Sequence, residues 1–527
     1  MLRVSFYQLS LTRVDPDRIG LSPDAFERQL PELLSLAVSP AELQELAGSA
    51  EGAPTRCVLS KLAMVLLRFR YDLSERELVE RCRRDLGFRY ALGLEDGEDP
   101  PSERTYRRFQ DRLLEVKGEE YLFALSLRAA HAAGVLDDTA LQAVDSTDTG
   151  CRGAVIDTFN LVAAAIRQVI QWTARCLGRR PAELARDWGL SRYMARSIKG
   201  AADIDWSDEE QRNELLTREV GDADALVERV RDIANKVRLP GKVEEAVELL
   251  QTVARQDVEE LEDGTFRIAR GTASRRIISV SDPEARHGRK SASKTINGFK
   301  THVMGTIESQ FVTGIAITDA ATHDAEPTGT LLDQTEAHDL RPDELVGDSA
   351  YGAGANIRDS AERGVELHTK VPRPSARGAF PKQDFDIDVD ALRVTCPAGI
   401  TTEEYTMVGE NEPGGPVAQF RFSKADCQAC AMRDECCSAT AKGGRRVIRL
   451  NQYERELHAN RTFAQTERGK QVLRSRSSVE RLISHLVRMG MRHARFFTMA
   501  RVQVQAFMVA AAYNLQRLFT LRAAASG

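Results

Sequence analysis

LQAVDSTDTG, residues 141–150, interrupts the helical pattern on either side of it and is the first indication of a sheet in the chain. Its apolar beginning predicts a short strand that ends at Asp145, followed by Ser, Thr and Gly. DELVGDSAYGAG, residues 343–354, predicts another strand, which ends at Asp348. Two carboxylates that are distant along the chain therefore stand at the ends of two predicted strands.

The sequence around these two strands predicts an α/β core that is interrupted by insertions. Residues 152–262 show helical spacing, first apolar and then strongly charged, which indicates a helical insertion. The remaining predicted strands lie at residues 275–282, 298–309, 311–320 and 364–372. From Pro372 to about Glu454 the composition shifts to Pro, Gly, Cys and Asp with few periodic runs, which indicates a second insertion.

The N-terminal part is predicted to be a short helical bundle, in which Ser74 and Glu77 form a capping box. PPSERTYRRFQDRLLE, residues 100–115, offers Ser102 as an N-cap for a helix that a DNA groove could accept. The basic and polar positions of that helix are Thr105, Arg107, Arg108 and Arg112. A solvated basic face is the competing interpretation, and the sequence leaves both open.

The chain ends in two predicted helices, residues 476–490 and 498–519, the second apolar enough to be buried. In the first, Arg476, Glu480 and Ser484 share one face at i, i+4 spacing. The opposite, apolar stripe consists of Val479, Leu482, Ile483 and Leu486. Arg476 could orient Glu480 or hold a DNA phosphate, and an ordinary helical ion pair is the alternative.

Two aspartates at strand ends and a glutamate on a late helix suit metal-assisted phosphoryl transfer. Hard oxygen ligands hold Mg²⁺ and leave coordination positions for phosphate and water. Asp145, Asp348 and Glu480 are the candidate ligands of two such ions, Mg²⁺ or Mn²⁺, which would lie about 4 Å apart.

The motifs VDSTDTG, GFKTHV, GDSAYG and RSSVERLISHLVR resemble, in their order, the catalytic motifs of DDE transposases from bacterial insertion sequences. The resemblance implies a ribonuclease-H-like core, and it assigns the metal-binding carboxylates to Asp145, Asp348 and Glu480. Asp148 competes with Asp145, which we favour because the predicted apolar strand ends there. Leu473 stands where the family has a tyrosine, which weakens any role for an aromatic side chain at that position.

Five of the nine cysteines gather in the second insertion, and in a reducing cytosol such a cluster favours metal binding over disulfides. Cys427 and Cys430 form a CxxC pair, Cys436 follows at short range, and Cys396 stands alone. These four could close a structural zinc site. Reduced thiols in a poorly packed insertion are the alternative, and the sequence does not decide between Cys436 and Cys437.

DNA contacts must come from local patches, because the net charge is −5 and the pI about 6.1. Residues 461–527 are strongly basic, and a second basic run spans residues 284–302, for which a solvated loop is the alternative. The predicted DNA-binding residues are Arg289, Lys290, Lys294, Lys300, Arg476, Arg481 and Arg488. His323 and Asp324 are interpreted as a surface turn and are assigned no chemistry.

The sequence thus predicts an enzyme that binds terminal inverted repeats, hydrolyses a phosphodiester and transfers the resulting 3′-OH to target DNA. A non-catalytic DNA-binding derivative and a nuclease that cuts without joining are the alternatives. The N-terminus shows no secretory signal and no apolar run is long enough for a membrane span, so a cytoplasmic, nucleoid-associated location is expected. Synapsis of two DNA ends implies at least a homodimer.

The predicted organisation is a helical DNA-binding domain at 1–135, a catalytic core at 136–150, 263–372 and 461–527, a helical insertion at 151–262 and a Cys-rich insertion at 373–460.

Overall fold

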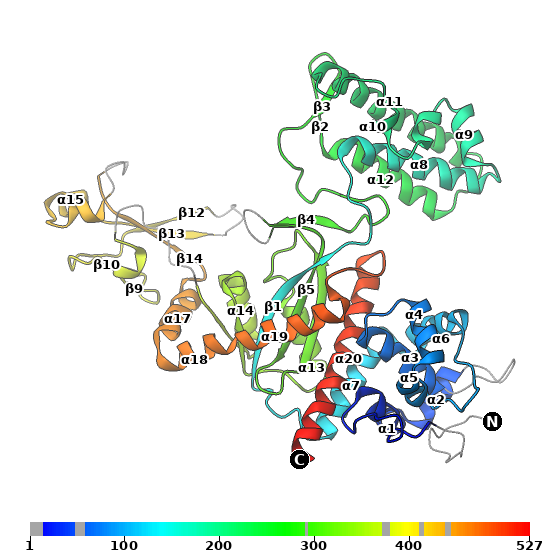
Figure 1. Ribbon diagram of the computed structural model, residues 1–527. Helices are drawn as coiled ribbons and strands as arrows, with labels where there is room; N and C mark the ends of the chain where they lie inside the picture. Colours follow the sequence, from blue (N-terminus) through cyan, green and yellow to red (C-terminus); the bar gives the residue numbers. More distant parts are fainter. Residues whose placement is uncertain are drawn as a thin grey trace.

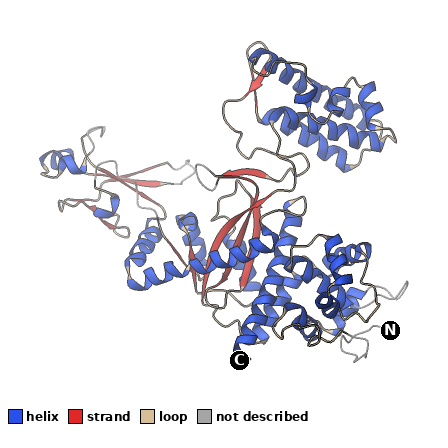
Figure 2. Cartoon of the chain, viewed as in Figure 1, coloured by secondary structure: helices blue, strands red, loops and turns tan. Residues whose placement is uncertain are grey.

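The computed structural model describes residues 14–47, 58–289, 294–371, 380–409, 416–437 and 444–526. A mixed sheet lies at the centre, with helices packed against it and two smaller units projecting from it (Figure 1, Figure 2). The fold is therefore mixed α/β, as the sequence predicts.

The central sheet has six strands: β1 Leu141–Gly150, β4 Arg286–Arg289, β5 Thr295–Thr306, β6 Val312–Asp319, β7 Glu344–Gly347 and β8 Glu366–Thr369. β1 lies between β5, which runs antiparallel to it, and β7, which runs parallel. β4 and β6 both pair with β5, while β8 pairs in parallel with β7. The strands predicted at residues 298–309, 311–320 and 364–372 are confirmed as β5, β6 and β8, and the strand predicted before Asp348 is confirmed as β7.

Alternation along the strands gives the sheet two buried faces. Val144 and Leu345 pack in a cluster with α13 Thr328–Ala337 and α14 Gly354–Glu362. Their neighbours Ala143 and Val346 belong to the main cluster, which includes α19 Ser477–Leu486 and α20 Met499–Ser526. The sheet is thereby covered on both sides, and the apolar last helix is buried as predicted.

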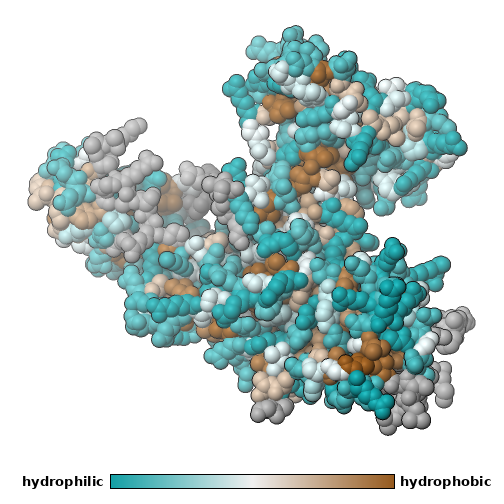
Figure 3. Space-filling view, viewed as in Figure 1, coloured by the Kyte–Doolittle hydropathy of each residue, from teal (hydrophilic) through white to brown (hydrophobic). Residues whose placement is uncertain are grey.

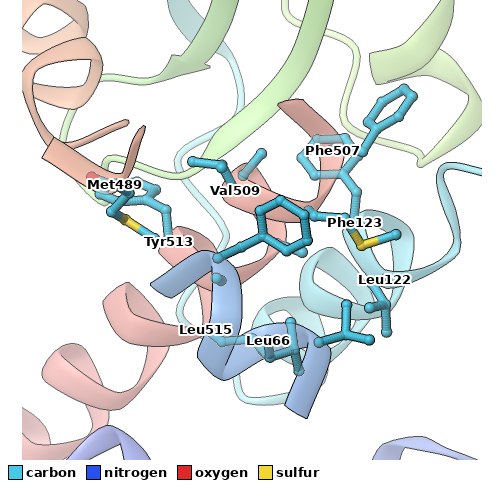
Figure 4. Packing of buried hydrophobic residues seen from close by; sticks show 14 of the residues in the cluster. Leu66, Leu122, Phe123, Met489, Phe507, Val509, Tyr513 and Leu515 are labelled. Carbon is cyan, nitrogen blue, oxygen red and sulfur yellow. The ribbon is translucent and has the colours of Figure 1, made fainter. Parts of the chain in front are cut away.

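The N-terminal helices belong to the main cluster as well. They are α1 Phe26–Ala37, α2 Pro40–Ala47, α3 Val58–Arg70, α4 Glu75–Arg84, α5 Leu86–Leu92, α6 Glu103–Lys117 and α7 Tyr121–Ala132. Figure 4 shows Phe123 of α7 against Phe507 of α20, with the ring centroids 5.6 Å apart. The predicted capping box of Ser74 and Glu77 is present at the start of α4. These helices are therefore packed in the same hydrophobic cluster as α20 and one face of the sheet.

The helical insertion has a hydrophobic cluster of its own and projects beyond β4 (Figure 1). It consists of α8 Thr158–Cys176, α9 Pro181–Asp187, η1 Ser191–Met194, α10 Ile198–Ala201, α11 Glu209–Ala234, α12 Gly241–Gln256 and the short strands β2 Val258–Glu260 and β3 Phe266–Ile268.

The Cys-rich unit also has its own small cluster, and it projects from the other side of the sheet (Figure 1). It contains β9 Asp386–Asp388, β10 Arg393–Thr395, β11 Thr401–Thr402, β12 Tyr405–Val408, β13 Val417–Arg421, α15 Lys424–Ala429, α16 Arg433–Cys436 and β14 Val447–Asn451. α17 Glu454–Gln465 and α18 Glu467–Ser475 then lead from β14 to α19.

The sequence prediction was wrong at two places in the sheet. β1 does not end at Asp145, because residues 146–150 continue the antiparallel ladder with residues 298–302 of β5. Residues 275–282 form no strand, and Ile277 makes only an isolated bridge to Arg286. The apolar side chains of this segment are buried in the cores of the sheet and of the helical insertion, which explains their pattern without a strand.

Figure 3 shows hydrophilic residues over most of the visible face, with an apolar patch over the N-terminal helical block. Within the described ranges, no helix combines the length and the apolarity that crossing a membrane requires.

Candidate active site

Asp145 and Asp348 come from neighbouring parallel strands at the same level of the sheet. Ala143 of β1 lies opposite Val346 of β7, and the two aspartates stand two residues further along each chain. Asp348 follows the last residue of β7, where its carboxylate accepts a hydrogen bond of 2.9 Å from the amide of Ala350. Both aspartates line one cavity of about 920 Å³. The sheet thus brings these two predicted carboxylates together.

A buried tyrosine lies among the carboxylates of this cavity. Tyr351, which follows Asp348 in the short helix η2 Ser349–Tyr351, is fully buried. Burial raises the pKa of its phenol well above the ordinary value, and the charges of Asp324, Asp145 and Asp348 raise the pKa further. The phenol is therefore a neutral hydrogen-bonding group in this site.

Glu480 is connected to Asp145 through one arginine. Arg476 donates to Oδ2 of Asp145 at 2.9 Å and to Oε1 of Glu480 at 2.5 Å. The Glu480 side chain is 54% exposed, and the residue is absent from those that line the cavity. Arg476 and Glu480 therefore share one helix face as predicted and form an ion pair, and the same guanidinium also contacts Asp145 of β1.

α19 lies close against the sheet because its apolar stripe and a glycine permit it. Val479, Leu482, Ile483 and Leu486 are all buried, as the sequence predicts. A Cβ atom placed on Gly305 of β5 would lie 2.6 Å from the carbonyl oxygen of Phe311 and 2.7 Å from Cδ1 of Leu482. The absence of a side chain at position 305 thus sets how near α19 and Glu480 come to β1 and β5.

Asp148, the competitor of Asp145, also lines the cavity but is held by two basic side chains. Arg492 approaches its Oδ1 to 2.6 Å and Lys294 to 3.6 Å. Burial opposes ionisation of this carboxyl, but the hydrogen bond and charge of Arg492 outweigh it and lower the pKa of Asp148. Asp148 is therefore an ionised carboxylate already neutralised by protein cations.

Asp324 faces the cavity, although its sequence context was interpreted as a surface turn. Its carboxylate accepts from Lys300 Nζ at 2.7 Å and from Ser146 Oγ at 3.1 Å. Burial raises the pKa of Asp324, and the hydrogen bond and charge of Lys300 more than reverse that effect. The register of the β5–β6 hairpin is the signal that could have found this pair, because it places Lys300 opposite Thr318, just before the loop that carries Asp324.

His302 is a buried titratable residue that the sequence pattern did not indicate. It is fully buried between Thr318, whose hydroxyl lies 2.9 Å from Nε2, and the hydroxyl of Tyr351, 3.4 Å from Nδ1. Burial lowers the pKa of His302 to about 4, so its ring is neutral at pH 7.

The residues predicted to bind DNA lie in different parts of the structure. Arg289 and Lys300 line the cavity, and Lys294 lies at its edge beside Asp148. Arg481 and Arg488 are exposed on and just beyond α19, where Arg488 contacts His485. Lys290 lies outside the described residues.

In the N-terminal block, the expected recognition helix is α6, and Ser102 caps it as predicted. Two of its arginines have protein partners. Arg107 pairs with Glu75, and Arg112 donates to the carbonyl oxygens of Leu46 and Glu45. Arg108 is exposed and remains available for a partner outside the chain.

A different group has the tightest arrangement of potential metal ligands in the described part of the chain. One ligand atom each from Glu344, Glu366 and His368 lies within 4.8 Å of the others, whereas the three predicted carboxylates do not form so tight a group. The Glu344–His368 contact is 2.9 Å, and Arg468 binds the other oxygen of Glu344. Glu344 begins β7 whereas Asp348 follows its end, so this ion-paired group lies away from the cavity.

Two family models match the chain. Residues 395–519 match a model described as a transposase DDE domain, and residues 18–112 match a model described as a transposase domain (DUF772). Together these matches support a DDE transposase of the insertion-sequence type, as the order of the motifs indicates. Glu480 and the clustered cysteines lie inside the first match, while Asp145 and Asp348 lie between the two. No curated protein and no solved structure matches the chain significantly.

Proposed function

We propose that this transposase binds the terminal inverted repeats of a mobile element, hydrolyses a phosphodiester bond to free a 3′-OH, and transfers that hydroxyl to target DNA. The observation that carries the proposal is the convergence of Asp145 and Asp348 on one cavity, with Glu480 tied to Asp145 by Arg476. The mixed sheet, with antiparallel strands on one side of β1 and parallel strands on the other, supports a ribonuclease-H-like core.

The chemistry of the donor set fits a divalent cation. Carboxylate oxygens are the ligands that Mg²⁺ and Mn²⁺ prefer, and the cavity is large enough to admit a phosphodiester beside them. Asp145, Asp348 and Glu480 would hold the metal, which supplies Lewis-acid activation of the scissile phosphate. Asp348 is fixed by its bond to the Ala350 amide, and Arg476 holds the other two carboxylates near each other.

The basic residues of the site would bind the DNA backbone. Arg289, Lys300 and Lys294 stand in or beside the cavity, where they can neutralise phosphates without reading the base sequence. Arg481 and Arg488 would extend this contact along α19. Because two element ends must be joined, the DNA complex would contain at least two copies of the chain, in the cytoplasm and near the nucleoid.

A strand-transfer assay tests the proposal. Wild-type protein, Asp348→Ala and the control Asp343→Asn are incubated with labelled element-end DNA and with Mg²⁺ or Mn²⁺. Asp343 is exposed one residue before β7, so its substitution leaves the cavity intact. We expect cleavage and joining by the wild type and by the control, and neither by Asp348→Ala. Equal DNA binding by all three without cleavage would favour a non-catalytic DNA-binding protein, and cleavage without joining would favour a nuclease.

A further inference from the structure

The clustered cysteines, which the catalytic site does not use, face one another in the Cys-rich unit. Cys396, Cys427, Cys430, Cys436 and Cys437 all line a single cavity of about 30 Å³. They come from three places in the sequence: the turn after β10, the end of α15 and the end of α16. All five are free thiols, so disulfides do not account for the arrangement.

We propose that this cavity binds one structural zinc ion through Cys396, Cys427, Cys430 and one member of the Cys436–Cys437 pair. Four cysteine thiolates in a tetrahedron are a common structural zinc site in proteins, and a CxxC pair commonly supplies two of them.

The backbone at Cys396 and at the Cys427–Cys430 pair already has the tight turns that such a site needs. The amide of Cys396 donates to Ile400, and the amide of Gly399 donates to the carbonyl oxygen of Cys396, both at 2.8 Å. Gly399 has φ +82°, a conformation that glycine adopts without strain. Cys427 lies in the short helix α15 and Cys430 directly follows its end, while Ser423 caps its N-terminus. The turns therefore direct two separate chain segments toward one point.

A backbone amide and an arginine side chain lie beside the cysteines of this cavity. The backbone amide of Arg446 donates to the thiol of Cys427. The Arg446 side chain also donates to the carbonyl oxygen of Cys436 at 3.1 Å. The guanidinium and the backbone amide of Arg446 therefore lie where they can stabilise the negative charge that four metal-bound thiolates would carry.

The sulfurs would have to move closer together on binding. Among the described cysteines, no three sulfur atoms lie within 4.8 Å of one another, although Cys427 and Cys437 are hydrogen-bonded. Zinc replaces the thiol protons, which pass to solvent, and the four Zn–S bonds of about 2.3 Å draw the turns together. No oxidation or reduction is involved.

The Cys-rich unit needs such a crosslink because its own core is small. Its buried apolar residues are Phe385, Val394, Ala418, Phe420, Phe422, Ile448 and Leu450. A cluster of this size contributes little against the chain entropy of the unit, and small units of this kind commonly depend on a metal. Lys382 binds the buried Glu454 at the start of α17, so the unit is tied to the helices that lead to Glu480.

The test is the zinc content of the purified full chain, measured by elemental analysis after removal of loosely bound metal. We expect about one zinc per chain in the wild type and in the controls Cys151→Ser and Cys176→Ser, which alter cysteines far from the cavity. Cys427→Ser should lose the metal. Of Cys436→Ser and Cys437→Ser, one should lose it and the other keep it, which identifies the fourth ligand.

A spectroscopic measurement covers the case in which a variant fails to fold. Wild-type protein reconstituted with Co²⁺ should show the absorption of tetrahedral cobalt thiolate, and addition of Zn²⁺ should abolish it. Wild-type protein that binds neither ion under reducing conditions, or a Cys427→Ser variant that retains zinc as the controls do, would overturn the proposal. Neither result depends on DNA cleavage, so the zinc site can fail while the transposase proposal stands.

Discussion

Replacement of Glu219 should remove a strong pH dependence from the stability of the helical insertion. Glu219 lies on α11 with no exposed surface, and neither carboxylate oxygen has a hydrogen-bond partner among the described residues. Burial raises its pKa to about 9, with further contributions from Asp157 and Asp222 and an opposing one from Arg192. Glu219 is therefore protonated in the folded insertion at pH 7.

The pKa values of Glu219 in the folded and in the unfolded chain determine the direction and the size of this pH dependence. The folded chain keeps this proton up to about pH 9, whereas the unfolded chain releases it above about pH 4.5. The free energy of unfolding therefore decreases as the pH rises between these values, by about 1.4 kcal/mol per pH unit. At pH 7 the free energy of unfolding of the wild type is therefore about 3 kcal/mol lower than at a pH below 4.5. Glutamine has nearly the same shape and does not titrate, so Glu219→Gln should not show this loss.

The assay is urea unfolding of the full chain at pH 5 and at pH 7, followed by tryptophan fluorescence. The three tryptophans of the chain, Trp172, Trp188 and Trp206, all lie in the insertion, so the signal reports on that unit. The stability of Glu219→Gln relative to the wild type should rise by about 2.5 kcal/mol from pH 5 to pH 7. Glu214→Gln, an exposed change on the same helix, should follow the wild type. An identical pH dependence in the wild type and in Glu219→Gln would show that Glu219 is not protonated in the folded insertion at pH 7.

Two further substitutions test the packing of α19 on the sheet and the charges of the cavity. Gly305→Ala should force α19 away from β5, because the new methyl group would meet Leu482; we expect a loss of about 1–3 kcal/mol in thermal unfolding and weaker cleavage through displacement of Glu480. Lys300→Met leaves the carboxylate of Asp324 without its main counter-charge, so the pKa of Asp324 should rise. The variant should lose about 1–3 kcal/mol at pH 7 in chemical unfolding, and the loss should shrink as the pH falls and Asp324 takes up a proton. An undiminished loss at low pH would contradict that explanation.

The sequence was sufficient where a local pattern determines the structure. Ser74 and Glu77 lie three residues apart, so their capping box needs no tertiary information. The apolar stripe of α19 and the i, i+4 pair of Arg476 and Glu480 are also local, and both are confirmed. The mixed α/β class follows from the same kind of pattern.

Non-local pairing accounts for the errors. β1 continues past Asp145 because β5, which lies more than a hundred residues later in the chain, pairs with it, and polar Ser and Thr residues give no sign of that partner. The apolar residues near Ile277 fill two cores without forming a strand, which a single-sequence pattern cannot distinguish from a strand. Asp324 was missed because its role depends on the hairpin that brings it to Lys300. The equal level of Asp145 and Asp348 in the sheet also depends on a non-local feature, the register of β1 and β7. Their role as metal ligands stays a prediction.

A calorimetric titration of the DNA-free protein with Mn²⁺ measures whether the three carboxylates bind a metal ion together. Asp145→Asn, Asp348→Asn and Glu480→Gln are compared with the wild type and with the exposed control Asp343→Asn. We expect each of the three variants to bind Mn²⁺ at least about tenfold more weakly than the wild type and the control, because each removes an anionic oxygen ligand. Wild-type affinity in all three variants would contradict this expectation.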